Sequence, residues 1–262
     1  MWRYDLHVHT KYSSDGKSSI KEVVSRAEQI GLSGIAITDH NVLKGALEAK
    51  GIPSNIEIIP GCEITLNNGK HIIGLYLTKE MNKNDLDSVI LDIHNQEGLA
   101  MLPHPFRAKS GLLNNYKMTD NNRLKEIASK FDLIEIYNPT CSYNENLHAF
   151  NLWKTMKANV IKISASDAHT AWQLGIGQTL FMSAEHSINN TIQVKFKDLI
   201  KAEKITREIF IGNYNRILTI YDGRPPIIRV KQLMKKEFPF LKKLYQYFLS
   251  EKIQNRSKKR RK

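Results

Sequence analysis

Histidine and acidic residues recur at the ends of apolar segments between residues 7 and 169 of this 262-residue chain. The first two are His7 and His9, in the segment Tyr4-Asp5-Leu6-His7-Val8-His9. Residues i and i+2 of a strand point to the same side, so both imidazoles can bind one ion, and Asp167 and His169 repeat this spacing. Between the two pairs the chain carries five more residues of metal-binding type, namely Asp15, His40, Glu63, His71 and His104.

Together these positions offer six imidazoles and three carboxylates but no thiolate. Zn, Mn and Fe accept such nitrogen and oxygen ligands, whereas structural zinc sites commonly use cysteine. A single histidine in a protein core is more often a packing residue than a ligand, so metal binding is inferred from the ordered set and not from any one residue. The set indicates a hydrolytic centre with divalent transition-metal ions.

Four blocks of this set resemble the polymerase and histidinol phosphatase (PHP) family of metal-dependent phosphoesterases. The blocks are Asp5–Thr10, Thr38–His40, Pro103–Pro105 and Ser166–His169, with Glu63 and His71 between them. The resemblance spans residues 1 to about 180 and implies that all nine positions are ligands. Asp15 stands where some members carry histidine, which changes the charge at one ion.

The resemblance also implies how two or three ions are shared among these residues. One ion would take His7, His9, Glu63 and Asp167, a second Glu63, His71 and His104, and a third Asp15, His40 and His169. Glu63 would bridge the first two ions, and Glu63 and Asp167 are the expected catalytic residues. Such a cluster lowers the pKa of water and supplies hydroxide for attack on a phosphate ester near neutral pH.

The segments that position these residues alternate between strand and helix patterns. Strands are expected at residues 4–9, 34–38, 56–64, 71–77, 99–102, 133–137 and 160–164. Helices are expected at residues 20–30, 42–51, 84–97, 119–130 and 142–157. The alternation predicts parallel βαβ units, with a hairpin at residues 67–70. Candidate ligands follow the carboxyl ends of strands, where barrel enzymes build active sites, and the hairpin would return His71 to that end.

Periodicity alone leaves a closed barrel and an open doubly wound sheet about equally favoured. No Gly-x-Gly-x-x-Gly motif follows an early strand, which disfavours a dinucleotide-binding fold. The family resemblance implies a distorted (β/α)7 TIM-like barrel. The predicted fold class is therefore α/β, with a barrel of this type.

Two further residues are candidates for substrate binding. Arg107 follows His104 by three positions, and its guanidinium matches phosphate oxygens bidentately, although a solvated loop arginine is an equally good interpretation. Asn138 ends a strand and could orient substrate or a ligand, but Asn138-Pro139 is also a turn signal. Asp39 alternates away from His40 on its strand, which favours support of a ligand over ligation.

Length and composition fit one main catalytic domain. A chain of 262 residues can form a single α/β barrel. No apolar run approaches the roughly 20 residues needed to cross a bilayer, and no signal-peptide pattern is present at the N-terminus. Cys62 and Cys141 lie outside any CxxC motif, which favours a reduced chain in the cytoplasm.

Most of the positive charge lies near the C-terminus. Between Arg229 and Lys262 there are 13 Lys and Arg and two Glu, which account for +11 of the formal net charge of +13. We therefore expect a barrel domain over residues 1–221 and a basic amphipathic helix with a disordered tail over residues 222–262. This extension could contact nucleic acid or an anionic membrane surface, pack on the barrel, or be merely a soluble terminus.

The favoured interpretation is a cytoplasmic metal-dependent phosphatase that hydrolyses a phosphate monoester of a small metabolite or nucleotide. A nuclease or exonuclease that cleaves phosphodiesters of short nucleic acids is the main alternative, and the basic tail favours it. A non-catalytic metal-binding module is a third hypothesis, which the complete ligand set disfavours. A metal-hydroxide barrel could also cleave C–N bonds as an amidohydrolase.

Overall fold

The computed structural model describes residues 2–116, 120–156, 160–181, 196 and 209–211. Its strands are β1 (Trp2–Val8), β2 (Gly34–Ile37), β3 (Glu57–Thr65), β4 (His71–Leu75), β5 (Leu99–Leu102), β6 (Leu133–Tyr137), β7 (Ile161–Ser164), β8 (Thr179–Phe181) and β9 (Ile209–Ile211). Its helices are α1 (Ile20–Gln29), α2 (Lys44–Lys50), α3 (Leu86–Asn95), α4 (Asn121–Ala128), α5 (Tyr143–Thr155) and the short 3-10 helix η1 (Ala171–Gln173).

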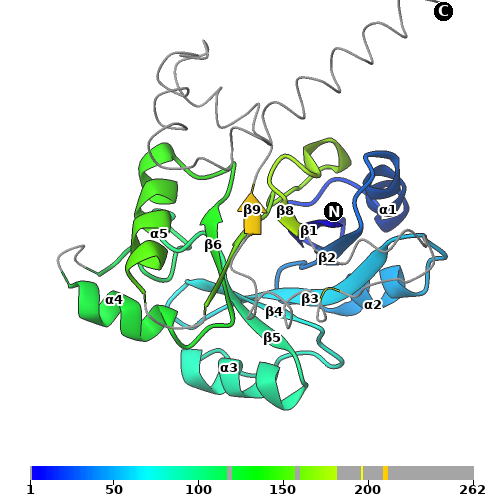
Figure 1. The fold of residues 1–262 in the computed structure, drawn as a ribbon. Coiled ribbons are helices and arrows are strands. Elements are labelled where there is room, and N and C mark those ends of the chain that lie inside the picture. Colours follow the sequence, from blue (N-terminus) through cyan, green and yellow to red (C-terminus); the bar gives the residue numbers. More distant parts are fainter. Residues whose placement is uncertain (1, 117–119, 157–159, 182–195, 197–208, 212–262) are drawn as a thin grey trace, which may run out of the picture. The chain divides into compact units, whose positions relative to one another are not determined.

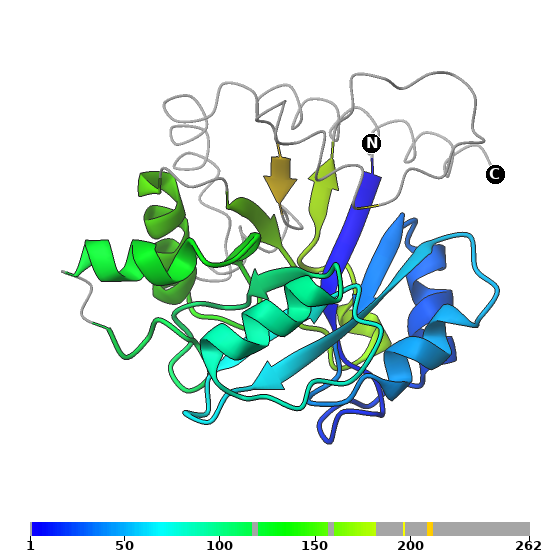
Figure 2. The same cartoon turned by 90° about the horizontal axis from the view of Figure 1, so that it is seen from below.

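The strands form one sheet that curves into a nearly closed barrel (Figures 1 and 2). The strand order is β7-β6-β5-β4-β3-β2-β1-β8-β9, with parallel pairing among β1, β2 and β3 and again among β5, β6 and β7. The end strands β7 and β9 contact each other. The fold is therefore a distorted TIM-like barrel in which β8 and β9 occupy the gap between β7 and β1.

Side chains join the two sides of this gap. The Thr179 hydroxyl of β8 accepts a hydrogen bond from Ser164 N at 3.0 Å and donates to Ser164 O of β7 at 2.9 Å. The Asp5 carboxylate of β1 accepts from the backbone N–H groups of Ser166 and Gly175, both at 2.9 Å. Complete burial raises the pKa of Asp5 to about 6. These contacts pair buried backbone groups that the short strands leave unpaired.

The hairpin of β3 and β4 interrupts the parallel pattern. β4 pairs antiparallel with both β3 and β5, and His71 lies opposite Thr65. The turn closes with hydrogen bonds from Leu66 N to Lys70 O and from Gly69 N to Leu66 O, and Gly69 has a φ of +74° that favours glycine. Because the chain reverses here, the first residue of β4 lies at the end of the barrel where β3 ends.

The main helices lie on the outside of the curved sheet (Figure 1). Helix α1 begins at a capping box of Ser19 and Glu22, and it buries Ile20, Val23, Val24 and Ala27. A second capping box, of Ser142 and Glu145, starts α5. Burial of one apolar face in this way anchors each helix and the loop that precedes it.

The seven strands predicted before residue 165 are all present, and the prediction of the barrel is confirmed. Strands β8 and β9 were not predicted, because three residues are too few to show a period. Cys62 and Cys141 are free and buried. No helix among the described residues is long and apolar enough to cross a membrane. The predicted C-terminal extension and its boundary at residue 221 lie outside the described residues.

Candidate metal centre

The barrel brings all nine predicted ligand positions together at one end. β1 carries His7 and leads into His9 and the loop with Asp15, and His40 follows β2. The β3–β4 hairpin supplies Glu63 and His71. The segments after β5 and β7 supply the remaining three residues, His104, Asp167 and His169. Parallel strands deliver their carboxyl ends to the same rim, so residues separated by up to about 160 positions in sequence become neighbours.

Four of these side chains form an inner group centred on the imidazoles of His7 and His9. It consists of His7 Nε2, His9 Nε2, Glu63 Oε2 and Asp167 Oδ1. The five distances that involve an imidazole nitrogen run from 3.1 to 3.4 Å. Nitrogen and oxygen ligands that each lie about 2.0–2.2 Å from one Zn ion are themselves about 3 to 3.5 Å apart, so these distances fit ligands of a shared ion.

The hydrogen bonds of the two inner imidazoles favour a cation at that centre. His7 Nδ1 lies 2.8 Å from Glu135 Oε1, and an ionised carboxylate can only accept. His9 Nδ1 lies 3.0 Å from the Ser13 hydroxyl, which itself lies within donating distance of Asp39. Each Nδ1 therefore carries a proton, and the two Nε2 atoms, 3.1 Å apart, are the nitrogens left to bind an ion. A bound cation would replace any proton on these Nε2 atoms.

Glu63 divides its two oxygens between different imidazoles. Oε2 lies 3.2 Å from both His7 Nε2 and His9 Nε2 and 3.3 Å from His40 Nδ1. Oε1 lies 2.9 Å from His71 Nδ1 and 3.0 Å from His104 Nε2. A carboxylate with this arrangement can bind one ion through each oxygen.

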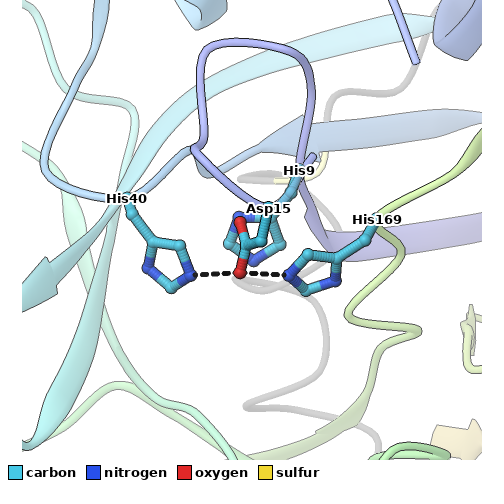
Figure 3. A group of neighbouring side chains, drawn as sticks. All are labelled: His9, Asp15, His40 and His169. Atoms are coloured by element: carbon cyan, nitrogen blue, oxygen red, sulfur yellow. Dashed lines mark hydrogen bonds and ion pairs between the residues drawn. The ribbon is translucent and has the colours of Figure 1, made fainter. Parts of the chain in front are cut away.

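A third group lies at the exposed edge of the cluster. Asp15 Oδ2 is 3.0 Å from His169 Nε2 and 3.5 Å from His40 Nε2. Figure 3 shows the Asp15 carboxylate between these two rings, with His9 beside them. Half of the Asp15 side chain is exposed, whereas His7, His9, Glu63, His104 and Asp167 are buried. The cluster therefore opens to solvent on the side of this third group.

The donor groups overlap more than the family resemblance implied. His9 belongs to the inner group and also lies with Asp15, His40 and His169. His104 also lies with His7 and Asp167, and His40 with Glu63 and His71. The three expected sets are thus parts of one continuous cluster.

Buried opposite charges govern the pKa values in the cluster. Burial alone lowers the pKa of His7, but Asp167, Glu63 and Glu135 outweigh it and hold the pKa well above the ordinary value. Burial raises the pKa of Glu63, but the nearby imidazoles outweigh that effect and hold the pKa well below its usual range. The carboxylates are therefore ionised and ready to bind a cation.

Two of the clustered residues have unusual backbone conformations. His104 has a φ of +26° and Asp167 a φ of +52°. Left-handed backbone costs a non-glycine residue about 1–2 kcal/mol, so neighbouring contacts must hold both residues in place. In each case the conformation turns a donor atom toward the cluster.

Arg107 and Asn138 are both at the centre, and both contact Asp167. Arg107 Nη2 donates to Asp167 Oδ2 at 2.5 Å and also contacts Asn138 Oδ1 and the Thr140 hydroxyl. Burial lowers the pKa of Arg107, but Asp167 outweighs it and raises that pKa. Asn138 is fully buried, and its Nδ2 donates to Glu135 at 3.0 Å. Arg107 is thus bound to a cluster carboxylate, and the solvated-loop interpretation is wrong.

Sequence reasoning missed three side chains that support the cluster: Ser13, Glu135 and Thr140. Glu135 is a charged residue inside the apolar strand β6, and this was the available signal for it. Ser13 and Thr140 carry no such signal in their local sequence. Asp39 was assigned a supporting role, and its carboxylate accepts hydrogen bonds from Thr10 and Ser13.

A separate cavity of about 270 Å³ lies near the cluster. Its walls include Cys62 and Ile64 of β3, the positions on either side of Glu63, together with Asn41, Leu43 and residues 80–84. Side chains alternate along a strand, so this cavity is on the opposite face of β3 from Glu63. Burial raises the pKa of the Cys62 thiol to about 12, so this thiol lines the cavity in its neutral form.

Comparisons with known proteins agree with this geometry. The sequence model of the PHP domain family matches residues 5–160. An uncharacterized protein of Methanocaldococcus jannaschii is 37% identical over 115 residues, which cover 39% of this chain and 67% of that protein. Ribonuclease P protein component 3 of Methanococcoides burtonii is 30% identical over 142 residues, covering 50% of this chain and 55% of that protein.

A solved structure shares the fold at low sequence identity. Endonuclease Q, in a complex with a 27-mer duplex carrying an abasic lesion at the active site, superposes with a TM-score of 0.54 and 15% identity. The match covers 78% of this chain and 57% of endonuclease Q. This chain thus spans little more than half of ribonuclease P component 3 and of endonuclease Q.

Proposed function

The chain belongs to the PHP domain family, and from this premise we propose that it is a metal-dependent hydrolase that cleaves a phosphate ester. The observation that carries the proposal is the division of the Glu63 oxygens between two sets of imidazoles. A bridging carboxylate of this kind is typical of hydrolytic centres with two or more divalent ions.

The residues present fit two or three Zn, Mn or Fe ions. The inner group would hold one ion, Glu63 with His71 and His104 a second, and Asp15 with His40 and His169 a third. When bound, such ions lower the pKa of water and neutralise the charge of a phosphate. We assign the catalytic roles to Glu63 and Asp167, because their carboxylates contact the largest number of imidazoles.

The side chains of the chain itself would bind and orient the substrate. His40, His71 and His169 are partly exposed, and they surround the open side of the cluster together with Asp15. A phosphate group would approach from this side, while the buried inner group stays protected from bulk water. Arg107 is about one quarter exposed and could bind phosphate oxygens while it holds Asp167. Asn138 contacts both Arg107 and Asp167 and would hold these two side chains in position.

The favoured substrate is a phosphate monoester of a small metabolite or nucleotide. The second candidate is a nuclease that acts on phosphodiesters of short nucleic acids. Its support is the basic C-terminal segment together with the similarity to ribonuclease P component 3 and to the fold of endonuclease Q. The cytoplasm is the proposed location, in line with two free cysteines.

Metal content and a substrate screen test the proposal. Elemental analysis of protein purified without chelator should find two or three transition-metal ions per chain. Fewer than one ion per chain, with no increase in bound metal after addition of Mn, Fe or Zn, would contradict the proposal. The protein would then have no metal centre.

The metal-loaded protein should then be screened on phosphorylated metabolites and on oligonucleotides with 5′- or 3′-phosphates. Release of inorganic phosphate supports the monoesterase, and shortened oligonucleotides support the nuclease. A metal-loaded protein that cleaves neither class, but cleaves an amide, would support an amidohydrolase. No turnover of any of these would support the non-catalytic module.

A further inference from the structure

Glu135 is a buried carboxylate that belongs to none of the donor groups of the cluster. It lies in the middle of β6, and its side chain is fully buried. Oε1 lies 2.8 Å from His7 Nδ1, and Oε2 accepts hydrogen bonds from His104 N at 2.6 Å and from Asn138 Nδ2 at 3.0 Å. One carboxylate therefore contacts two residues from separate parts of the cluster.

We propose that Glu135 is a positioning residue that sets the ligand geometry of His7 and His104 together, so that two metal sites depend on one carboxylate. The inference rests on the proposed metal assignment. It adds a residue that the family resemblance did not include among the nine ligands.

The first contact selects the tautomer of His7. A carboxylate only accepts, so Nδ1 of His7 must carry a proton, and Nε2 is the nitrogen left to bind an ion. The opposite tautomer would place a proton in the centre of the inner group, 3.1 Å from His9 Nε2. Glu135 thereby keeps the inner group competent to bind metal.

The second contact holds the backbone of His104. The φ of this residue is +26°, a backbone conformation that residues other than glycine rarely adopt. The His104 Nδ1 atom is buried and has no hydrogen-bond partner among the described residues, so no neighbour orients the ring through that atom. Two hydrogen bonds hold this backbone, from His104 N to Glu135 at 2.6 Å and from Arg107 N to His104 O at 3.0 Å. The bond to Glu135 is the one that a side chain makes, and it helps to maintain the direction of the ring toward Glu63.

A carboxylate is required because three donors converge on it. His7 Nδ1–H, His104 N–H and Asn138 Nδ2–H all point at the two oxygens of Glu135. A glutamine of the same shape offers one oxygen and one amide NH₂ group, so at least one of the three donors would meet another donor. Either His7 changes its tautomer or the His104 backbone loses its partner. Both changes weaken metal binding without a change in side-chain volume.

The test is the variant Glu135→Gln, compared with Asp132→Asn. Asp132 also pairs with an imidazole, His94 Nε2 at 2.9 Å, but the pair lies outside the cluster. Zinc affinity should be measured by chelator competition, with circular dichroism to verify the fold. We expect Glu135→Gln to lose about 10- to 100-fold in affinity at two sites, as for the loss of other residues that support metal ligands. Asp132→Asn should retain the affinity of the wild-type protein.

A second measurement uses only the wild-type protein and does not depend on the folding of a variant. In the zinc-loaded protein, ¹⁵N spectra of the histidine rings should place the proton of His7 on Nδ1. A proton on Nε2 of His7, or an unchanged affinity in a folded Glu135→Gln variant, overturns the proposal. Wild-type protein that binds no metal at all would instead contradict the proposed function, so the two failures are distinguishable.

Discussion

The two oxygens of Glu63 contact imidazoles from four different elements of the barrel. Oε2 lies near His7, His9 and His40, and Oε1 near His71 and His104. A change at this residue thus affects more of the cluster than a change at any one imidazole. Among single residues, Glu63 is the strongest candidate for control of the proposed chemistry.

We expect Glu63→Gln to reduce kcat/KM on the substrate found by screening by at least about 100-fold, or about 2.7 kcal/mol. The amide keeps the shape but removes the negative charge that two ions would share. His94→Ala is the matched control, because His94 pairs with Asp132 away from the cluster. Similar, mild losses in both variants would exclude the bridging role.

His9 predicts how pH affects the metal-free protein. Burial alone lowers its pKa, but Asp167 and Glu63 raise it from the ordinary value of 6.5 to about 9. Protonated His9 therefore stabilises the fold fully below pH 6.5, and this contribution is lost as the pH rises through about 9. A metal ion replaces the proton, so metal affinity should rise over the same window.

Two titrations test this pH dependence. Urea unfolding of the metal-stripped protein should give a lower free energy of unfolding at pH 9 than at pH 6.5. Zinc affinity, measured by chelator competition, should increase between the same values. An affinity that is independent of pH would show that no proton leaves the cluster when metal binds.

At the scale of elements, the barrel depends on two short strands to bridge its gap. β8 has three residues, and Thr179 at its start hydrogen-bonds to both backbone groups of Ser164 in β7. β7 leads directly to Asp167 and His169. The contact between β7 and β8 thus supports the segment that completes the cluster.

Thr179→Val should destabilise the protein by about 2–3 kcal/mol, because it leaves the buried N–H and C=O groups of Ser164 without a partner. The control is Thr155→Val at the end of α5, where the hydroxyl donates to Leu152 O of the same helix. That change should cost less than about 1 kcal/mol. Equal unfolding midpoints in urea for the two variants would mean that Thr179 does not help to close the barrel.

At the scale of the whole molecule, the feature to be tested is the basic C-terminal segment. We propose a domain boundary near residue 221, with the barrel before it and the basic extension after it. Residues 222–262 contain none of the nine candidate ligands but carry about +11 of the net charge. The proposed chemistry and the charge are therefore separable by truncation.

Truncation after Tyr221 should leave hydrolysis of a small phosphate ester within about threefold of the full chain, provided that the barrel folds. If nucleic acid is the substrate, oligonucleotide affinity should fall sharply and its salt dependence should flatten, because fewer counterions are released. The matched control keeps the chain length and replaces the six Lys and Arg of residues 256–262 by Gln. Unchanged affinity and salt dependence in both variants would reject a nucleic-acid role for this segment.

Much of the fold could be predicted from local patterns. Capping boxes, apolar periods and the turn at residues 67–70 predicted the elements, and β5 and β6 have the expected bounds. The nine candidate ligands were predictable because their residue types recur at strand ends, which a barrel collects at one rim. Local sequence is sufficient here, since strand and helix patterns depend on near neighbours.

Only the tertiary structure shows which donor atoms meet. The division of the Glu63 oxygens, the pairing of Arg107 with Asp167 and the contact of Glu135 with His104 join residues that are far apart in sequence. These contacts depend on the register and curvature of the sheet and on the backbone conformations of His104 and Asp167. No local pattern encodes such features, because they arise when distant strands pair and the barrel closes.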